Sequence, residues 1–182
     1  MDRVFPLARK ILIGEDITAR AVSDTINKIF EINESDRIKE DIYKEYKTPP
    51  IELFINSVGG VIYDGLALFD VIKNSKTPVH TIAIGSTMSM GLWIFMAGKE
   101  RLVGKNATLM WHDVGVFSHG KTEEVKQDLE ESKRLQKKAI DAICCETLVE
   151  EDTLQDYIIR KAEWYITPKQ AIELQIATGY YK

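Results

Sequence analysis

Short apolar runs alternate with longer amphipathic stretches along this chain. Apolar runs bounded by glycine or proline are typical of buried strands, and apolar residues three and four positions apart are typical of helices. Strands that alternate with helices favour an α/β domain with parallel pairing. The pattern predicts strands at residues 10–14, 51–55, 79–84, 101–103 and 107–111, and helices at residues 18–30, 65–72, 88–97, 122–146, 151–161 and from Thr167 onward.

Three stretches depart from this simple alternation. Residues 34–50 are strongly charged and end in two prolines, which predicts a solvated loop or a short surface helix. Residues 81–98 are apolar enough to suggest a membrane span, but their glycines, serines and threonines fit a buried strand, turn and helix better. The predicted helix at 122–146 carries an apolar stripe, which must cover either the domain body or another subunit.

Composition narrows the class of protein. The 182 residues, 45% of them hydrophobic, suffice for a single domain (1–182) with a sizeable core. The net charge of −4 argues against binding to nucleic acid or an anionic membrane, since both need a basic face. Cys144 and Cys145 are neighbours in a predicted helix and point in different directions, which favours a reduced, cytoplasmic protein over a disulfide. The first residues lack the basic and long apolar regions of a signal peptide.

Three motifs at predicted strand ends carry candidate chemistry. Ser89 lies in residues 85–91, a predicted strand-to-helix turn that exposes a hydroxyl at a helix N-terminus. Gly59 and Gly60 follow a buried strand and offer backbone N–H groups to a carbonyl oxygen. His112 follows another apolar strand and offers a base. Together they supply the nucleophile, oxyanion donors and proton carrier that acyl transfer needs.

Each of these residues also has a simpler interpretation. Ser89 could cap a helix, and His112 could be a core histidine bound by backbone groups. A capping serine does not explain the accompanying glycines and histidine, so we favour the nucleophile. The remaining histidines and nearby serines are interpreted as structural or turn residues: His80, His119, Ser57 and Ser86.

Residues 115–122, in an irregular stretch that contains glycine, match the phosphate-loop pattern G-x-x-x-x-G-K-[ST]. Glu123 and Glu124 follow directly, and their carboxylates would repel a triphosphate at the helix N-terminus. No later apolar strand ends in an aspartate that could help to hold Mg²⁺. We therefore interpret the match as a coincidence and not as a nucleotide site.

Several motifs, in the right order and at nearly the right spacing, resemble the ClpP family, the proteolytic subunit of the Clp protease. The resemblance spans residues 9–176 and rests on residues 9–14, 54–60, 65–70, 85–91 and 109–112. It implies a ClpP/crotonase-type α/β fold of repeated β-β-α units. Residues 114–146 would form a protruding handle, a strand plus a long helix, and residues 34–50 a charged insertion on the outer or apical surface.

The resemblance implies a serine endopeptidase with a Ser-His-acid triad. It assigns Ser89 as the nucleophile, His112 as the general base and Glu163 as the acid that orients the histidine. The backbone N–H groups of Gly60 and Met90 would form the oxyanion hole. Glu163 replaces the aspartate of the family and is one methylene longer, so its carboxylate must fold back or the histidine must shift.

Two further departures flank the site. Val58 replaces the family's proline beside the glycines, which should loosen that turn. Asp113 and Val114 replace the Gln-Pro pair after the histidine.

The resemblance also implies an assembly and a substrate. We expect self-association into heptameric rings, paired as double rings around a chamber, and a peptide or unfolded protein as substrate. The chain starts only a few residues before its first strand, whereas the family's longer N-terminal segment engages an AAA+ unfoldase, which argues against that partner. We expect no cofactor and no metal.

Two other functions stay open. One is a catalytically weak or inactive ring component, which Glu163 and the changes at Asp113 and Val114 favour and the retained serine, histidine and glycines oppose. The other is a crotonase-type acyl-CoA enzyme, which shares the broad architecture and an oxyanion hole of backbone N–H groups. That function leaves the combination of Ser89 with His112 unexplained.

Overall fold

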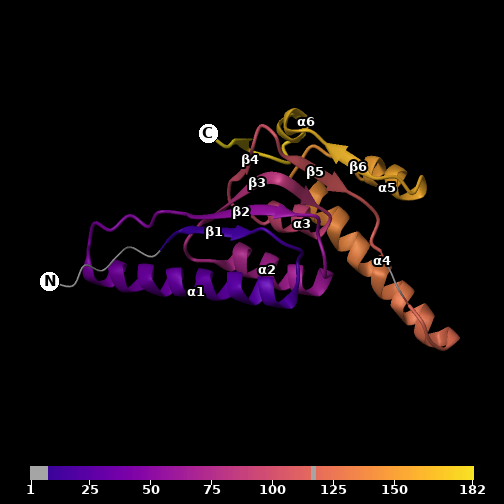
Figure 1. Ribbon diagram of the computed structural model, residues 1–182, viewed down its shortest axis with the longest axis horizontal. Coiled ribbons are helices and arrows are strands. Elements are labelled where there is room, and N and C mark those ends of the chain that lie inside the picture. The colour runs from indigo at the N-terminus through magenta and orange to yellow at the C-terminus, as the bar shows by residue number, and fades with distance from the viewer. Residues whose placement is uncertain (1–7, 116–117) are drawn as a thin grey trace.

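The computed structural model describes residues 8–115 and 118–182, and a seven-stranded sheet forms its centre (Figure 1). The strands are β1 (Lys10–Ile13), β2 (Ile51–Ser57), β3 (Val79–Met88), β4 (Arg101–Val103), β5 (Thr108–Trp111), β6 (Trp164–Ile166) and β7 (Gly179–Tyr180). The helices are α1 (Ala19–Ile42), α2 (Ile62–Asn74), α3 (Met90–Met96), α4 (Thr122–Cys144), α5 (Glu151–Ile159) and α6 (Pro168–Glu173).

The sheet is mostly parallel, which confirms the predicted α/β fold class. The strand order is β1-β2-β3-β4-β7, with every neighbouring pair parallel. A branch leaves this order at β3: β5 pairs with β3 in parallel, and β6 pairs with β5 in antiparallel orientation. The strands β6 and β7 were not predicted, because segments of three and two residues carry too little periodicity to be recognised.

The strand β3 is longer than the pattern predicts, and it changes partner half-way. Its first half pairs with β4 through Thr81–Ala83, and its second half pairs with β5 through Ser86–Met88. The prediction of a turn from residue 85 and a helix from Met88 was therefore wrong, since the ladder with β5 keeps the chain extended up to Met88 and α3 begins at Met90. Gly85, at a φ of 53°, bends the strand between its two halves.

The helix α1 is also longer than predicted. The charged residues after 33 continue the helix to Ile42, so the prediction of a loop or separate short helix over 34–50 holds only for residues after it. Arg37 forms ion pairs with Glu34 and Asp41, three and four positions away, on the solvent side. Ile29, Ile32 and Asp36 are buried on the other side.

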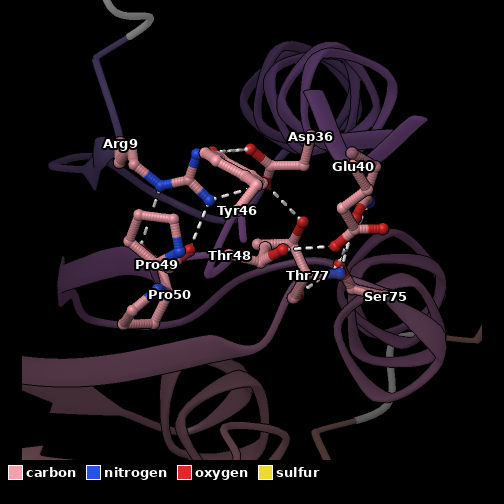
Figure 2. Close-up of polar contacts among 10 residues, drawn as sticks. Arg9, Asp36, Glu40, Tyr46, Thr48, Pro49, Pro50, Ser75 and Thr77 are labelled. Atoms are coloured by element: carbon pink, nitrogen blue, oxygen red, sulfur yellow. Dashed lines mark hydrogen bonds and ion pairs between the residues drawn. The ribbon is translucent and has the colours of Figure 1, made fainter. Parts of the chain in front are cut away.

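A buried polar cluster fixes α1 to the sheet (Figure 2). Asp36 is 2% exposed, and its carboxylate accepts two hydrogen bonds from the Arg9 guanidinium at 2.9 and 2.7 Å. Thr77, just before β3, and Tyr46 donate their hydroxyls to the same carboxylate at 2.7 and 2.8 Å. Burial opposes the charge, but these donors lower the pKa of Asp36 from 3.8 to about 2.

The helices α1 and α2 lie together along one side of β1 and β2, while α4 extends away from the body of the domain (Figure 1). The apolar side chains of α3 are all buried. Of the predicted protrusion at 114–146, the structure shows the helix α4, and the segment before it forms no strand at residues 112–115 and 118–121. Residues 116–117 lie outside the described residues, as do residues 1–7, in which the sequence predicts no signal peptide.

Two smaller points complete the fold. Among the residues that the structure describes, no helix combines the length and apolar character that a bilayer crossing requires. Cys144 ends α4 and Cys145 follows it, and both are free thiols.

Candidate active site

Ser89 occupies the single residue between β3 and α3, in a strained conformation. Its φ of 51° and ψ of −122° lie outside the regions that a residue with a side chain prefers. The backbone N–H of Ser89 donates to the Met110 carbonyl at 2.9 Å, which holds this turn against β5. The side chain makes no capping hydrogen bond to α3, so the structure gives no support to a capping role. Strain of this kind is concentrated at functional sites.

His112 lies one residue beyond β5, and its ring reaches the Ser89 hydroxyl. The parallel register pairs Met88 with Met110, which brings the carboxyl ends of β3 and β5 together. The His112 Nε2 atom lies 2.7 Å from the Ser89 Oγ atom, a hydrogen-bond distance. A serine hydroxyl bound to an imidazole is the arrangement that allows a base to accept the serine proton.

Gly59 and Gly60 lie beside Ser89 in conformations that favour glycine, with φ of 112° and 150°. A Cβ atom on Gly59 would lie 2.7 Å from the Ser89 Cβ atom, so only glycine allows this close approach. Ile17 donates to the Gly59 carbonyl and accepts from the Val61 N–H, both at 2.8 Å. In such a parallel bridge the N–H of the middle residue points away from the partner strand, which leaves the Gly60 N–H free of Ile17.

Met90 supplies a second backbone N–H beside Ser89. It is the first residue of α3, and the first N–H groups of a helix have no acceptor within that helix. Its side chain is 1% exposed and fixes the start of α3 in the core. The Gly60 and Met90 N–H groups thus have no acceptor in Ile17 and in α3, respectively.

A cavity of about 510 Å³ contains this group of residues. The turn after Gly60 and the start of α2 line one part of the cavity, and α4 lines another. Tyr63, at the start of α2, donates its hydroxyl to Glu131 of α4 at 2.7 Å. The Arg134 guanidinium binds the same carboxylate, and together these bonds lower the pKa of Glu131 to about 2. The cavity is lined by Gly60, Val61, Ile62, Tyr63, Ser89, Met90, Trp93, His112, Asp113, Val114, Gly115, Asp128, Glu131, Ser132 and Leu135.

Glu163 lies close to His112 in the strand register but is not bonded to it. It immediately precedes β6, whose Trp164 pairs with Trp111 of β5. The Glu163 side chain is exposed, and its carboxylate accepts a hydrogen bond from the Tyr165 hydroxyl. This bond raises the pKa of Tyr165. The structure therefore brings together four of the five predicted site residues, and the carboxylate of the fifth is turned toward its own strand.

The nearby serines have local structural partners. The Ser57 hydroxyl accepts from the Gly59 N–H at 3.2 Å, which stabilises the glycine turn. The Asn56 side-chain oxygen accepts from the N–H and hydroxyl of Ser86 at 3.0 and 3.2 Å. Asn56 thus bridges β2 and β3 where a bulge interrupts their ladder. Asn56 was not predicted as a site residue, although it belongs to the Asn-Ser-Val-Gly-Gly motif.

The histidines that were interpreted as structural lie elsewhere. His80 is in β3, with its Nδ1 atom 3.8 Å from the Glu100 carboxylate, and His119 is exposed before α4.

At the start of α4 the Glu124 carboxylate accepts from the Lys121 N–H at 2.9 Å, at the place where a phosphate loop would hold its anion. This contact supports the interpretation of the phosphate-loop match at residues 115–122 as a coincidence.

The fold and the site define a mixed α/β protein with a serine–histidine pair at the carboxyl ends of neighbouring parallel strands. The chain belongs to the Clp protease family, whose sequence profile matches residues 4–178. The predicted family is thereby confirmed over nearly the whole chain.

Individual relatives are distant but cover most of the chain. The chain is 27% identical over 182 residues to the ATP-dependent Clp protease proteolytic subunit 1 of Prochlorococcus marinus subsp. pastoris, covering 94% of this chain and 86% of the relative. It is 30% identical over 165 residues to the proteolytic subunit 2 of a Synechococcus species, covering 85% and 77%. It is 31% identical over 127 residues to the proteolytic subunit of Deinococcus radiodurans, covering 68% and 60%.

Proposed function

We propose that this protein is a serine endopeptidase in which Ser89 is the nucleophile and His112 the general base. The observation that carries the proposal is the 2.7 Å contact between the His112 Nε2 and Ser89 Oγ atoms within a cavity of about 510 Å³. Membership of the Clp protease family supports peptide hydrolysis as the reaction.

The chemistry follows from these positions. His112 accepts the Ser89 proton as the hydroxyl oxygen attacks a peptide carbonyl, and it then gives that proton to the leaving amine. The N–H groups of Gly60 and Met90 bind the oxyanion that forms, and removing one such donor costs about 10²–10³-fold in rate in other acyl-transfer enzymes. Water, activated by the same histidine, then hydrolyses the acyl-enzyme.

In the same proposal Glu163 is the third member of the triad. A carboxylate on the far side of the imidazole would hold its tautomer and stabilise its cation. To do so, the Glu163 carboxylate, which accepts from Tyr165 through one oxygen, must turn toward His112. The ring can still accept the serine proton without this bond, but less effectively.

A second candidate is a catalytically weak ring component. The observation that favours it is the present direction of the Glu163 carboxylate, which leaves His112 without an orienting acid among the described contacts. The serine–histidine contact and the strained Ser89 backbone weigh against it, because neither is needed in a scaffold. The other alternative was a crotonase-type enzyme that acts on an acyl-CoA thioester. Membership of the Clp protease family favours a peptide substrate instead.

We also propose that the protein works as a homo-oligomer, with a double heptameric ring as the expected form. The helix α4 extends from the domain body and exposes 39% of Val125 and 48% of Leu129 (Figure 1). A second copy would cover these side chains. Leu129→Asp should therefore reduce the assembled mass in light scattering, whereas Lys126→Asp on the same helix should not.

The experiment that tests the peptidase proposal is covalent labelling with a fluorophosphonate, followed by intact mass. One adduct on the natural protein and none on Ser89→Ala, with assembly unchanged, is the expected result. The absence of an adduct on a fully assembled ring would favour the scaffold. An adduct that persists on Ser89→Ala would assign the nucleophile to another residue.

A further inference from the structure

The chain immediately after His112 is attached to α4 by one side chain. The ladder between β5 and β6 ends at the pair Trp111 and Trp164, so no strand partner holds the residues that follow. Two residues beyond the histidine, the Val114 N–H donates to the Gln136 side-chain oxygen at 2.6 Å. Gln136 therefore fixes the backbone that carries the candidate base.

The other end of the Gln136 amide makes no comparable contact. Its Nε2 atom is buried and has no hydrogen-bond partner in the part of the chain that the structure describes. An unsatisfied buried donor costs about 1–3 kcal/mol, so an apolar side chain here would be cheaper for the fold alone. The hydrogen bond from the Val114 N–H to the Gln136 oxygen offsets part of this cost.

Val114 packs against the hydrophobic core, but packing gives the backbone on either side of it no fixed direction. Asp113, Val114 and Ser132 line the cavity that contains Ser89, and they also line a second cavity of about 530 Å³ between α4 and α5. Loss of the Gln136 hydrogen bond would remove the directional restraint on this segment beside the cavities. A shift of about 1 Å in a reacting group can cost 10²-fold in rate.

We infer that Gln136 is a positioning residue, which holds the Val114 backbone so that the His112 ring stays within hydrogen-bond distance of Ser89. This inference rests on the proposed peptidase function. It makes α4 part of the active-site support, because the helix that extends from the body also supplies this acceptor. The role matters all the more because the Glu163 carboxylate is bonded to Tyr165 instead of to His112.

Two substitutions of Gln136 distinguish the effect of its hydrogen-bond acceptor from the effect of its side-chain size. Gln136→Glu keeps an oxygen that can accept from the Val114 N–H, whereas Gln136→Met has a similar size and no strong acceptor. Gln127→Met is the matched control, since Gln127 is exposed on the same helix. The measurement is the second-order rate of fluorophosphonate labelling of Ser89 by intact mass, well below the unfolding midpoint of each variant and normalised to its folded fraction. Hydrolysis of a small ester by each variant gives kcat and KM separately.

We expect Gln136→Met to slow labelling by about tenfold or more and to lower kcat without raising KM, because the histidine is displaced from the serine. Gln136→Glu should stay within about threefold of the natural protein, and Gln127→Met should match it. Labelling of Gln136→Met at the natural rate would overturn the inference, as would equal slowing in Gln136→Glu. Absence of labelling in the natural protein itself would overturn the peptidase proposal, and the positioning role with it.

Discussion

Trp111 and Trp164 form the last pair of the antiparallel ladder between β5 and β6, and His112 and Glu163 are the residues directly beyond that pair. Residues at opposed positions have their side chains on the same face of a sheet. Tyr165 lies two residues after Glu163, also on that face, and its hydroxyl binds the carboxylate. In the proposed peptidase, Tyr165 competes with His112 for the Glu163 carboxylate.

This competition predicts opposite effects of two substitutions. Glu163→Gln should lower kcat for peptide hydrolysis by at least about tenfold, because an amide cannot stabilise the imidazolium. Tyr165→Phe should leave kcat unchanged or raise it up to a few-fold, because the carboxylate loses its other partner. Steady-state kinetics on a short fluorogenic peptide would measure both.

The double variant Glu163→Gln/Tyr165→Phe is the control for this competition. If Glu163 acts on His112, removing the tyrosine hydroxyl should bring no gain once the carboxylate is gone. A natural rate in Glu163→Gln would exclude the residue from the triad and favour another carboxylate, such as Asp156, or none.

Gly59 gives a second prediction, based on space alone. Gly59→Ala places a methyl group 2.7 Å from the Ser89 Cβ atom at a φ of 112°, so the serine turn must move. We expect loss of Ser89 labelling and a destabilisation of about 1–3 kcal/mol, as for other strained backbone positions. Gly14→Ala is the matched control, because its new methyl group lies no closer than 3.5 Å to Leu12.

Labelling rate and urea unfolding together test this prediction. A Gly59→Ala protein that labels at the natural rate would show that the glycine turn and Ser89 are not tightly packed in solution. A Gly14→Ala protein with the same loss would point to a general effect of alanine on the turns of this domain.

Glu131 leads to a prediction about pH. Its bonds to Arg134 and Tyr63 hold its pKa at about 2, so the carboxylate keeps its charge at pH values well above 2. Glu131→Gln should therefore leave the number of ionisations in the acidic limb of the kcat/KM profile unchanged, since that limb reports groups of the free enzyme that change charge in this range. Loss of an ionisation from that limb in Glu131→Gln, but not in Glu130→Gln on the same helix, would show that Glu131 itself titrates in this range.

The periodicity of the sequence was sufficient for most of the fold and for the two central residues of the site. Ser89 and His112 follow apolar runs, and in a parallel sheet the ends of neighbouring strands meet at one edge. The chain gives no comparable signal for the second half of β3. Gly85 and Ser86 have the composition of a turn, and only pairing with β5 keeps Ser86–Met88 extended.

Other features depend on contacts between distant parts of the chain. The charged end of α1 is helical because Arg37 pairs with acids one turn away and Asp36 finds Arg9 on the buried side. The direction of the Glu163 carboxylate is a choice of rotamer that no spacing encodes. In the sequence Gln136 resembles any other polar residue of a long helix. Only the folded structure places the backbone after His112 beside it.

The buried Asp36 carboxylate provides the last prediction, which concerns stability. Its pKa of about 2 in the folded protein lies below the ordinary value of 3.8, so its ionised form stabilises the fold. That contribution, about 2 kcal/mol, is complete above pH 3.8 and is lost as the pH falls toward 2. Asp36→Asn should remove it at every pH and also leave the Arg9 charge poorly compensated, for a loss of about 3–5 kcal/mol at pH 7.

Urea unfolding of the natural protein, Asp36→Asn and Asp24→Asn at several pH values between 7 and 2.5 would measure these differences. Asp24 is exposed on the same helix, and its substitution should change the free energy of unfolding by no more than about 0.5 kcal/mol. The gap between the natural protein and Asp36→Asn should narrow as the pH falls below 3.8, because the natural carboxylate becomes protonated and loses its advantage. A gap that stays constant down to pH 2.5 would show that the packing of the side chain, and not its charge, supports the contact between α1 and the sheet.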